Sequence, residues 1–297
     1  MTEIEPLTGD NVDDVYEMCE RAIVHHYVGR NRFRMFVLDN PNFDPELALV
    51  AREDGKVASF VFAVHKEKSE LAIFATDEKY RRKGLAGELY ARVETTLRSR
   101  NVEEIGALGG GFFSGLDLRY REAAVFLLRR LYTPQSIIYD QLFGVNDVDT
   151  DTSAREEKLA SEGVTFKRLA PDDAPALKTM LEKSFPGWLG TVNSLVSRTD
   201  SEYSVHAALD GDDIVAFAAR DGCNFGPTGT AEDYRRRGIG SVVFYRTCRD
   251  VASDGHDEMV IQAANFMFYA RAFACPIMPV WRSAKDLTAD PAIKKAK

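Results

Sequence analysis

The sequence carries one unusual heptapeptide twice, at close to half-chain spacing. Residues 80–86 read YRRKGLA and residues 234–240 read YRRRGIG, an offset of 154 positions in a chain of 297 residues. Each copy follows a short extended segment, 71–79 or 225–233, and each runs into an amphipathic helix. The apolar spacing of four in these helices is set by Leu85, Leu89, Val93 and Leu97, and then by Ile239, Val243, Thr247 and Val251. A strand, a basic glycine turn and a helix that recur together indicate two copies of one domain.

The repeated turn has the chemistry of a phosphate site. The first turn of a helix has backbone N–H groups without intrahelical partners, and the helix dipole makes that end partly positive. Gly84 and Gly238 keep side chains out of the way of an approaching anion. The surrounding positive charge comes from Arg81, Arg82, Lys83, Arg235, Arg236 and Arg237. A single copy is also compatible with a solvated basic helix start, but two copies in one context favour phosphate binding.

The pattern of this turn distinguishes between phosphate-binding families. The P-loop pattern is absent, and the dinucleotide fingerprint that Gly238 and Gly240 begin has Val243 in place of its third glycine. A dinucleotide-binding oxidoreductase remains an alternative that preferential binding of NAD would reveal. The pattern Arg-x-x-Gly-x-Gly/Ala directly after a strand resembles the pyrophosphate-binding segment of the GNAT superfamily of N-acetyltransferases. The resemblance covers both halves, so the chain looks like a tandem GNAT, a layout similar to that of mycothiol synthase.

The resemblance implies an α/β fold of two tandem GNAT-like domains, each a mixed, mostly antiparallel central sheet flanked by helices. It also implies acetyl-coenzyme A (acetyl-CoA) as cofactor, with the pantetheine arm lying along a splayed strand as an added strand would. The implied cofactor site of the first half comprises Phe74, Ala75, Thr76, Arg81, Arg82, Lys83, Gly84, Leu85, Ala86 and Gly87. That of the second half comprises Thr228, Gly229, Thr230, Arg235, Arg236, Arg237, Gly238, Ile239, Gly240 and Ser241. Both sites are expected to bind, the second at least as well because Gly240 lacks the methyl group of Ala86.

The chemistry that the resemblance implies is transfer of an acetyl group to a primary amine of a small acceptor. GNAT enzymes often carry a tyrosine general acid in a pattern that residues 268–274 resemble, which makes Tyr269 the candidate. Leu127 stands at the matching place of the first half, so the reaction is predicted in the second. A packing role for Tyr269 is the alternative. The candidate bases are Glu70, Asp77, Glu78, Asp221 and Glu232. A different class of function, a non-catalytic acyl-CoA-binding or sensing protein, also fits two intact turns.

Composition restricts the remaining options. A hydrophobic content of 45% is enough for two cores, and the net charge of −8 argues against a nucleic-acid partner. No apolar run is long enough to span a membrane, and the N-terminus lacks the order of a signal peptide, which predicts a cytoplasmic protein. The four cysteines have no zinc spacing, so no metal is expected, and the adjacent His25 and His26 are read as structural or surface residues. The sequence does not indicate an oligomeric state.

The order of predicted elements agrees between the halves and sets the domain boundaries. Residues 1–146 are predicted as the N-terminal domain and residues 164–297 as the C-terminal domain. The polar, charge-rich stretch 147–163 is predicted as the linker. Hairpins are expected around Asp54-Gly55 and Asp210-Gly211, a common turn pair. A short helix at 266–273 and a final strand at 278–283 are expected to complete the second domain.

Overall fold

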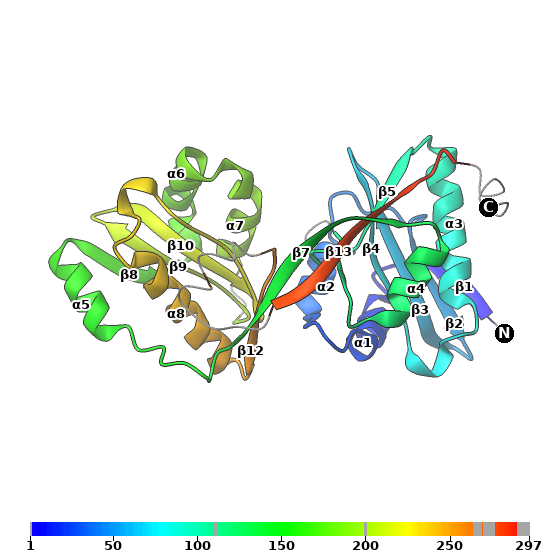
Figure 1. Ribbon diagram of the computed structural model, residues 1–297, viewed down its shortest axis with the longest axis horizontal. Coiled ribbons are helices and arrows are strands. Elements are labelled where there is room, and N and C mark those ends of the chain that lie inside the picture. The colour runs from blue at the N-terminus through cyan, green and yellow to red at the C-terminus, as the bar shows by residue number, and fades with distance from the viewer. Residues whose placement is uncertain (1, 110–111, 199–200, 264–268, 270–276, 290–297) are drawn as a thin grey trace. The chain divides into compact units, whose positions relative to one another are not determined.

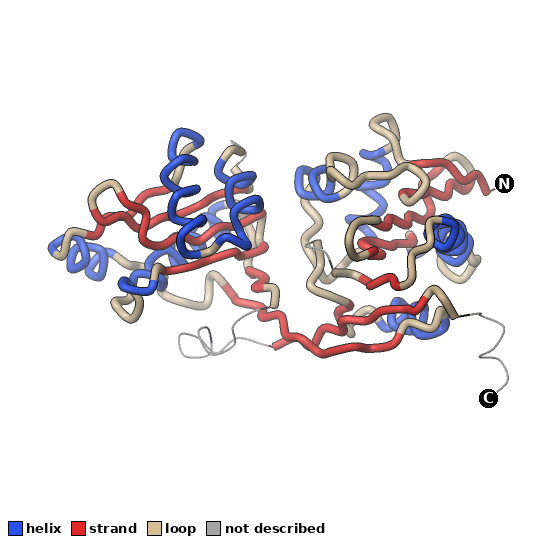
Figure 2. Tube along the Cα trace, turned by 90° about the horizontal axis from the view of Figure 1, so that it is seen from above, coloured by secondary structure: helices blue, strands red, loops and turns tan. Residues whose placement is uncertain are grey.

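The structure, a computed structural model, describes residues 2–109, 112–198, 201–263, 269 and 277–289. The chain forms two compact units (Figures 1 and 2). Unit 1 contains residues 1–139 together with 278–297, and unit 2 contains residues 140–277.

Unit 1 is a twisted mixed sheet with helices on both faces. Its strands pair in the order β1-β2-β3-β4-β5-β13-β7, and the short β6 pairs with β13. Its helices are α1 (Val12–Ala22), α2 (Arg30–Phe36), α3 (Leu85–Ser99) and α4 (Arg121–Arg129). Its strands are β1 (Thr2–Pro6), β2 (Ala48–Glu53), β3 (Lys56–Val64), β4 (Ser69–Thr76), β5 (Glu104–Ala107), β6 (Leu116–Asp117), β7 (Thr133–Gly144) and β13 (Ile277–Asp286). β7 continues into unit 2.

Unit 2 repeats this plan. From the second part of β7 its strands follow in the order β12-β11-β10-β9-β8. They are β8 (Val164–Arg168), β9 (Tyr203–Asp210), β10 (Asp213–Asp221), β11 (Asn224–Thr230) and β12 (Glu258–Ile261). Its helices are α5 (Ser153–Ser161), α6 (Ala174–Ser184), α7 (Leu189–Val196) and α8 (Ile239–Ser253). The expected fold class is confirmed in both units, and both predicted hairpins are present. No helix in the described ranges is long and apolar enough to cross a bilayer.

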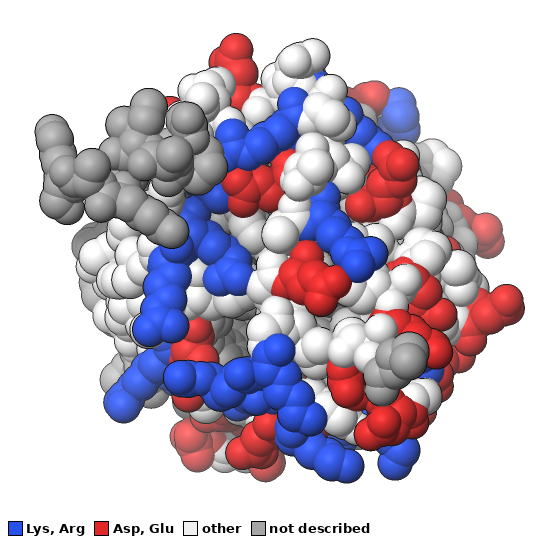
Figure 3. All heavy atoms as spheres, turned by 90° about the vertical axis from the view of Figure 1, so that its right-hand side faces the viewer, with Lys and Arg blue, Asp and Glu red and all other residues white. Residues whose placement is uncertain are grey.

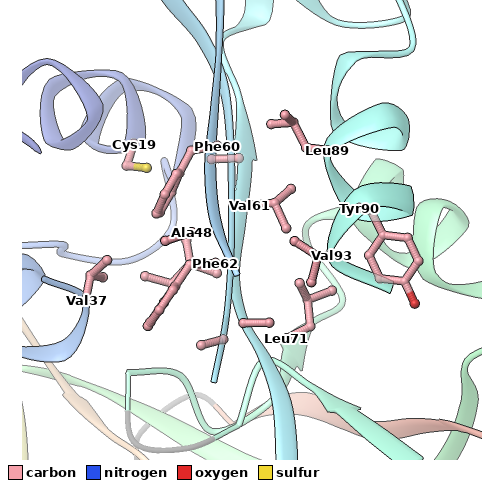
Figure 4. Close-up of a cluster of buried hydrophobic side chains, with 14 of the residues drawn as sticks. Cys19, Val37, Ala48, Phe60, Val61, Phe62, Leu71, Leu89, Tyr90 and Val93 are labelled. Atoms are coloured by element: carbon pink, nitrogen blue, oxygen red, sulfur yellow. The ribbon is translucent and has the colours of Figure 1, made fainter. Parts of the chain in front are cut away.

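The core of unit 1 follows from the period of two in its central strands. Along β3, Phe60 and Phe62 point to the side of α1, whereas Val61 points to α3 (Figure 4). All three side chains are completely buried. Leu89 and Val93 of α3 meet the sheet from the second side, as their spacing of four predicts (Figure 4). Because both faces of β3 are covered, its apolar run is continuous rather than alternating.

The central parallel ladder is interrupted at the same place in both units. β4 pairs with β5 from Ser69 to Leu71, and β11 pairs with β12 only at Asn224 and Phe225. Beyond these residues β4 and β11 keep their antiparallel partners β3 and β10 alone. Backbone groups on the free side of 74–76 and 228–230 therefore have no neighbouring strand among the described residues. The predicted splay is present in both units, at the spacing of 154 residues.

Two details differ from the sequence-based boundaries. The final strand does not complete unit 2: Ser283 to Asp286 of β13 pair antiparallel with β5 of unit 1. The predicted linker contains helix α5. The helix was not predicted because its sequence is almost entirely polar. In that helix Leu159 is buried, and the Glu156 carboxylate contacts the Arg246 guanidinium of α8 at 2.5 Å. Polar composition alone does not reveal such a helix.

A buried ion pair fastens β13 to unit 1. The Lys285 ammonium lies 2.5 Å from the Glu94 carboxylate of α3, with 7% and 17% of the two side chains exposed. Glu94 also accepts hydrogen bonds from Arg98, and Arg98 in turn donates to the Leu287 carbonyl. The last strand is thus tied to the helix that begins at the basic turn.

Lys285→Ala should destabilise unit 1 because it leaves the Glu94 carboxylate buried with Arg98 as its remaining partner. Loss of one partner of a buried pair costs about 3–5 kcal/mol, and the remaining contact with Arg98 places this case at the lower end. Urea unfolding followed by circular dichroism would measure it. The control is Lys167→Ala, whose pair with Asp173 is exposed and should be worth less than about 1 kcal/mol. Equal effects of the two changes would contradict a fastening role for Lys285.

Candidate active site

The two basic turns have the same backbone conformation. Arg82 and Arg236 have φ angles of 68° and 63°, and Gly84 and Gly238 have φ angles of 86° and 85°. Positive φ is uncommon for arginine, so the same pair of values in two copies marks one constrained turn. Gly84 and Gly238 are also the residues before the first helical residue of α3 and α8, and no side chain caps either helix. The first backbone N–H groups of both helices are therefore open to an anion.

The first arginine of each turn has a structural bond. Arg81 Nε donates to the Thr76 carbonyl at 3.2 Å, and Arg235 Nε donates to the Thr230 carbonyl at 3.0 Å. These bonds tie the turn to the last residue of the splayed strand. The third basic residues differ: Arg237 pairs with Glu162 at 2.9 Å, whereas Lys83 has no carboxylate partner among the described residues. The turn of unit 1 therefore keeps more unpaired positive charge.

Unit 1 contains a cavity of about 730 Å³ between the splayed strand and α4. It brings together most of the residues predicted for the first cofactor site: Phe74, Ala75, Thr76, Arg81, Arg82, Gly84, Leu85, Ala86 and Gly87. Lys83 is the predicted residue that does not line it. The cavity is mostly apolar, with Phe74 of β4 stacked on Phe126 of α4 at 4.9 Å between ring centroids.

Helix α4 adds three cations that the sequence pattern did not suggest. Arg121, Arg129 and Arg130 line the same cavity, as does Glu122. The Arg130 guanidinium lies over the Phe126 ring at 3.6 Å and so close to Gly87 that a Cβ there would lie 2.6 Å from it. Lys and Arg side chains form groups on the face of unit 1 in Figure 3, although the whole chain carries a net charge of −8.

A polar cluster at the cavity wall was also missed by the sequence analysis. His26, Asp117 and Tyr120 all line the cavity. The Tyr120 hydroxyl accepts the backbone N–H of His25 at 2.8 Å and lies 3.2 Å from His26 Nδ1. His26 Nε2 lies 3.9 Å from an Asp117 oxygen, and 6% of the His26 side chain is exposed. These residues come from the loop after α1, from β6 and from the residue before α4, a juxtaposition that no short motif encodes.

Electrostatics keep this cluster in a defined state of charge. Burial lowers the pKa of His26, and Arg119, His25 and Arg32 act in the same direction, while Asp117 opposes them. Burial alone would raise the pKa of Asp117, but hydrogen bonds from the Arg119 side chain and backbone, with its charge, hold that pKa below the usual range. Burial also raises the pKa of Tyr120. At neutral pH the cluster holds a neutral imidazole, a neutral phenol and a carboxylate.

Unit 2 places its predicted residues differently. Thr228, Gly229 and Thr230 lie on β11, and residues 235–241 form the turn and the start of α8. The Phe185 ring covers Gly229 so closely that a Cβ there would lie 2.6 Å from it. Phe185 also stacks on Trp188, with 5.4 Å between ring centroids. In unit 1 the corresponding residue, Ala75, instead lines the cavity.

The predicted general acid Tyr269 is buried in unit 2, with 4% of it exposed. Its ring centroid lies 5.9 Å from that of Phe244 and 6.2 Å from that of Phe225. The rest of its motif, residues 268 and 270–274, lies outside the described residues, as does most of the helix expected at 266–273. The catalytic role of Tyr269 stays a prediction.

The five candidate bases are scattered. Glu70 is half-buried, its carboxylate accepts the Gly109 N–H at 2.6 Å, and burial raises its pKa. Asp77 pairs with Arg21 at 3.2 Å, and Asp221 is buried in β10. Glu78 and Glu232 are exposed in the short helical turns before the basic residues. None of the five lines the described cavity. Within the described ranges no group of three metal-ligating side chains is placed to hold a metal ion.

Part of the sequence matches a known protein family. Residues 12–111 match the family model of the acetyltransferase (GNAT) family. No curated protein matches the sequence.

Three solved structures illustrate the fold. A tandem GNAT protein from the clavulanic acid biosynthesis pathway is 11% identical, covers 98% of this chain and 100% of its own, and superposes with a TM-score of 0.66. A GCN5-related N-acetyltransferase from Sphaerobacter thermophilus is 13% identical, with 96% of each chain covered and a TM-score of 0.61. The GCN5-related glucosamine N-acetyltransferase region of a fungal GH3 β-N-acetylglucosaminidase is 17% identical over 96% of this chain, with a TM-score of 0.66. This chain spans 38% of that fungal protein.

Unit 1 therefore contains a GNAT acetyltransferase domain, and the chain as a whole has the tandem GNAT fold. Family and fold together support acyl transfer as the class of activity.

His26 should make the protein less stable as the pH falls from 7 to 5. An unfolded histidine takes up a proton near pH 6.5, whereas folded His26, with its lowered pKa, stays neutral. Folding then opposes proton uptake, and the free energy of unfolding falls by up to about 2 kcal/mol over this range. Urea unfolding of the wild type and of His26→Gln at both pH values would show a smaller loss in the variant. Between pH 7.5 and 8.5 the two proteins should differ by a constant amount.

Proposed function

We propose that the protein transfers the acetyl group of acetyl-CoA to a primary amine of a small acceptor in the cytoplasm, and that this reaction takes place in unit 1. The observation that carries the proposal is the cavity of unit 1. One continuous space of about 730 Å³ joins the free edge of β4, the basic turn and the cluster of His26, Asp117 and Tyr120. The proposed acetyl-CoA site and a cluster of residues able to transfer protons thus line one cavity.

The residues of unit 1 fit the proposed cofactor. The backbone of 74–76 offers an unpaired strand edge for the pantetheine amides, in the manner of an added strand. The uncapped start of α3 offers N–H groups for the pyrophosphate, and Gly84 has open space where a Cβ would stand. Arg82 and Lys83, without carboxylate partners in the described part of the chain, add charge beside it. Acetyl-CoA would supply the activated thioester.

The chain's own contribution is positioning and proton transfer. Holding an amine against a thioester carbon in a mostly apolar cavity replaces a bimolecular encounter and excludes water. The acceptor amine would enter beside Ala22, Ile23 and Phe113, which line the cavity near the polar cluster. A cavity of about 730 Å³ has the size of a small-molecule site, which favours a small acceptor.

One observation favours the second class of function for unit 2. The Phe185 ring, stacked on Trp188, fills the space beside Gly229, whereas Ala75 at the matching place lines the cavity of unit 1. Unit 2 has an intact basic turn, but aromatic side chains occupy the space where an acceptor would bind. This combination suits an acyl-CoA-binding or sensing role without turnover. The two proposals are compatible: a catalytic unit 1 and a binding unit 2.

Variants of the turns in the full-length chain should show which units bind CoA. Because β13 belongs to unit 1, separated halves would lack a strand, so the test uses the whole protein. Calorimetry with CoA should give two sites in the wild type. Arg81→Glu with Gly84→Asp should weaken one of them, and Arg235→Glu with Gly238→Asp the other, each by a few kcal/mol (about the worth of charge-assisted hydrogen bonds).

The control for these variants is Lys79→Glu, a charge reversal like that at Arg81 or Arg235 but at an exposed residue outside the cavity lining. It should leave both sites intact. Unchanged binding in both turn variants would show that the cofactor assignment is wrong, and tight binding without amine-dependent thiol release would leave only the sensing role.

Tyr269→Phe tests the prediction that the second half is catalytic. If Tyr269 is the general acid, amine-dependent release of CoA thiol falls by roughly 10²–10⁴-fold while CoA affinity is kept. A reaction confined to unit 1 instead leaves turnover unchanged in this variant. Thiol release with a panel of small amines measures both outcomes.

A further inference from the structure

The polar contacts of the cluster in unit 1 run from Tyr120 through His26 to Asp117. Tyr120 lies directly before α4 and beside the loop after α1, with its ring stacked on the His26 ring at 5.7 Å and 20°. Its hydroxyl oxygen already accepts the His25 N–H at 2.8 Å. The second contact of this hydroxyl, to His26 Nδ1 at 3.2 Å, completes the chain toward Asp117.

Counting protons gives the direction of the second contact. A neutral imidazole has one N–H and one acceptor nitrogen. The Asp117 carboxylate, 3.9 Å from His26 Nε2, favours a proton on that nitrogen, which leaves Nδ1 as the acceptor. The phenol proton of Tyr120 then points to Nδ1. The hydroxyl oxygen keeps one lone pair beyond its bond with His25, at the wall of the cavity.

The charged neighbours hold this arrangement in place. Asp117 accepts from Arg119 Nε at 2.8 Å, from its Nη2 at 2.6 Å and from its backbone N–H at 2.8 Å. Phe113 packs edge-on against the His26 ring at 5.2 Å. The carboxylate is therefore fixed, ionised and buried, and it faces an imidazole that gains a positive charge when it takes up a proton.

We propose that Tyr120 and His26 form a proton relay for acyl transfer in unit 1, with Asp117 as the counter-charge. The inference rests on the proposed function. In the reaction the amine nitrogen forms a bond to the acetyl carbon, and the bond from that carbon to sulfur breaks. The amine loses one proton and the sulfur gains one, so the balance needs no further reactant.

The relay carries that single proton between the two atoms. The Tyr120 oxygen accepts the proton of the attacking amine while its own proton passes to His26 Nδ1. Because burial lowers the pKa of His26, this imidazolium exists only transiently, beside the Asp117 carboxylate. The reverse transfer then delivers a proton from Tyr120 to the departing sulfur and restores neutral His26. One hydroxyl can serve both atoms because nitrogen and sulfur are bound to the same carbon. Unit 1 then does not need a tyrosine general acid at the position of Leu127, because Tyr120 supplies the proton.

The part of unit 2 that the structure describes has no such relay at the matching positions. Counted from the last residues of the matching helices, Ala22 of α1 and Ser184 of α6, the position of His26 is held by Trp188 and that of Ile23 by Phe185. The Trp188 indole has a donor and no acceptor nitrogen, so it cannot take up a proton. At these two positions unit 1 therefore has residues that line an open cavity and include a proton acceptor. Unit 2 has two aromatic residues there.

Nitrogen NMR of the histidine-labelled full-length protein tests the arrangement without any acceptor. His26→Gln assigns the His26 signals. We expect Nε2 protonated and Nδ1 unprotonated at pH 7, and a clear shift of Nδ1 in Tyr120→Phe, which removes its hydrogen bond. A proton on Nδ1, or a Nδ1 signal that does not respond to Tyr120→Phe, overturns the relay.

Turnover tests the function of the same bond. With acetyl-CoA and the amine panel, Tyr120→Phe and His26→Gln should each lower kcat by roughly 10²–10⁴-fold, with the affinity for CoA unchanged. The double variant should be no slower than the slower single one, because both act on one proton path. His65→Gln and Tyr139→Phe, matched changes outside the cavity, should keep full activity.

Two results in these assays contradict the relay: full activity of either variant, or effects of the two changes that multiply. Failure of the proposed function has a different signature, because the wild type would then either not bind CoA or bind it without amine-dependent thiol release, whatever the NMR of His26 shows.

Discussion

The early end of the parallel ladder between β4 and β5 is the constraint on which the site of this protein depends. Pairing stops at Leu71 and Ala107, so the last residues of β4 keep one side free. The basic turn then follows within a few residues, tied back to Thr76 by Arg81. A longer ladder would close the space into which α4 and the end of α1 now project. The cavity, its cations and its polar cluster all exist because two strands separate there.

The internal duplication makes each unit a control for the other. Both turns share their unusual φ angles and their arginine-to-carbonyl bond. The units differ just after α1 and α6: Ile23 and His26 line the open cavity of unit 1, whereas Phe185, stacked on Trp188, covers Gly229 in unit 2. In our proposal the basic turn that both units share binds the acetyl donor. The residues that differ between the units determine which unit catalyses the reaction.

Local sequence patterns gave the repeat, the two turns and the order of elements, because each depends on residues close together in the chain. The cluster of His26, Asp117 and Tyr120 could not be found this way, since its members come from separate elements and adjacent histidines have no distinctive spacing. Helix α5 was missed because only Leu159 of its face is buried. The assignment of β13 depends on a pairing of Lys285 with Glu94 over 191 positions, which no window along the sequence contains.

The placement of β13 has a consequence for synthesis of the chain. Unit 2 is continuous from 140 to 277, so it can finish folding as soon as it has left the ribosome. Unit 1 is begun first but stays open at the edge of β5 until residues 277–286 have been made. An exposed strand edge of this kind invites pairing with other chains. The half that appears first is thus completed last, and nascent protein halted within unit 2 would carry an unfinished sheet.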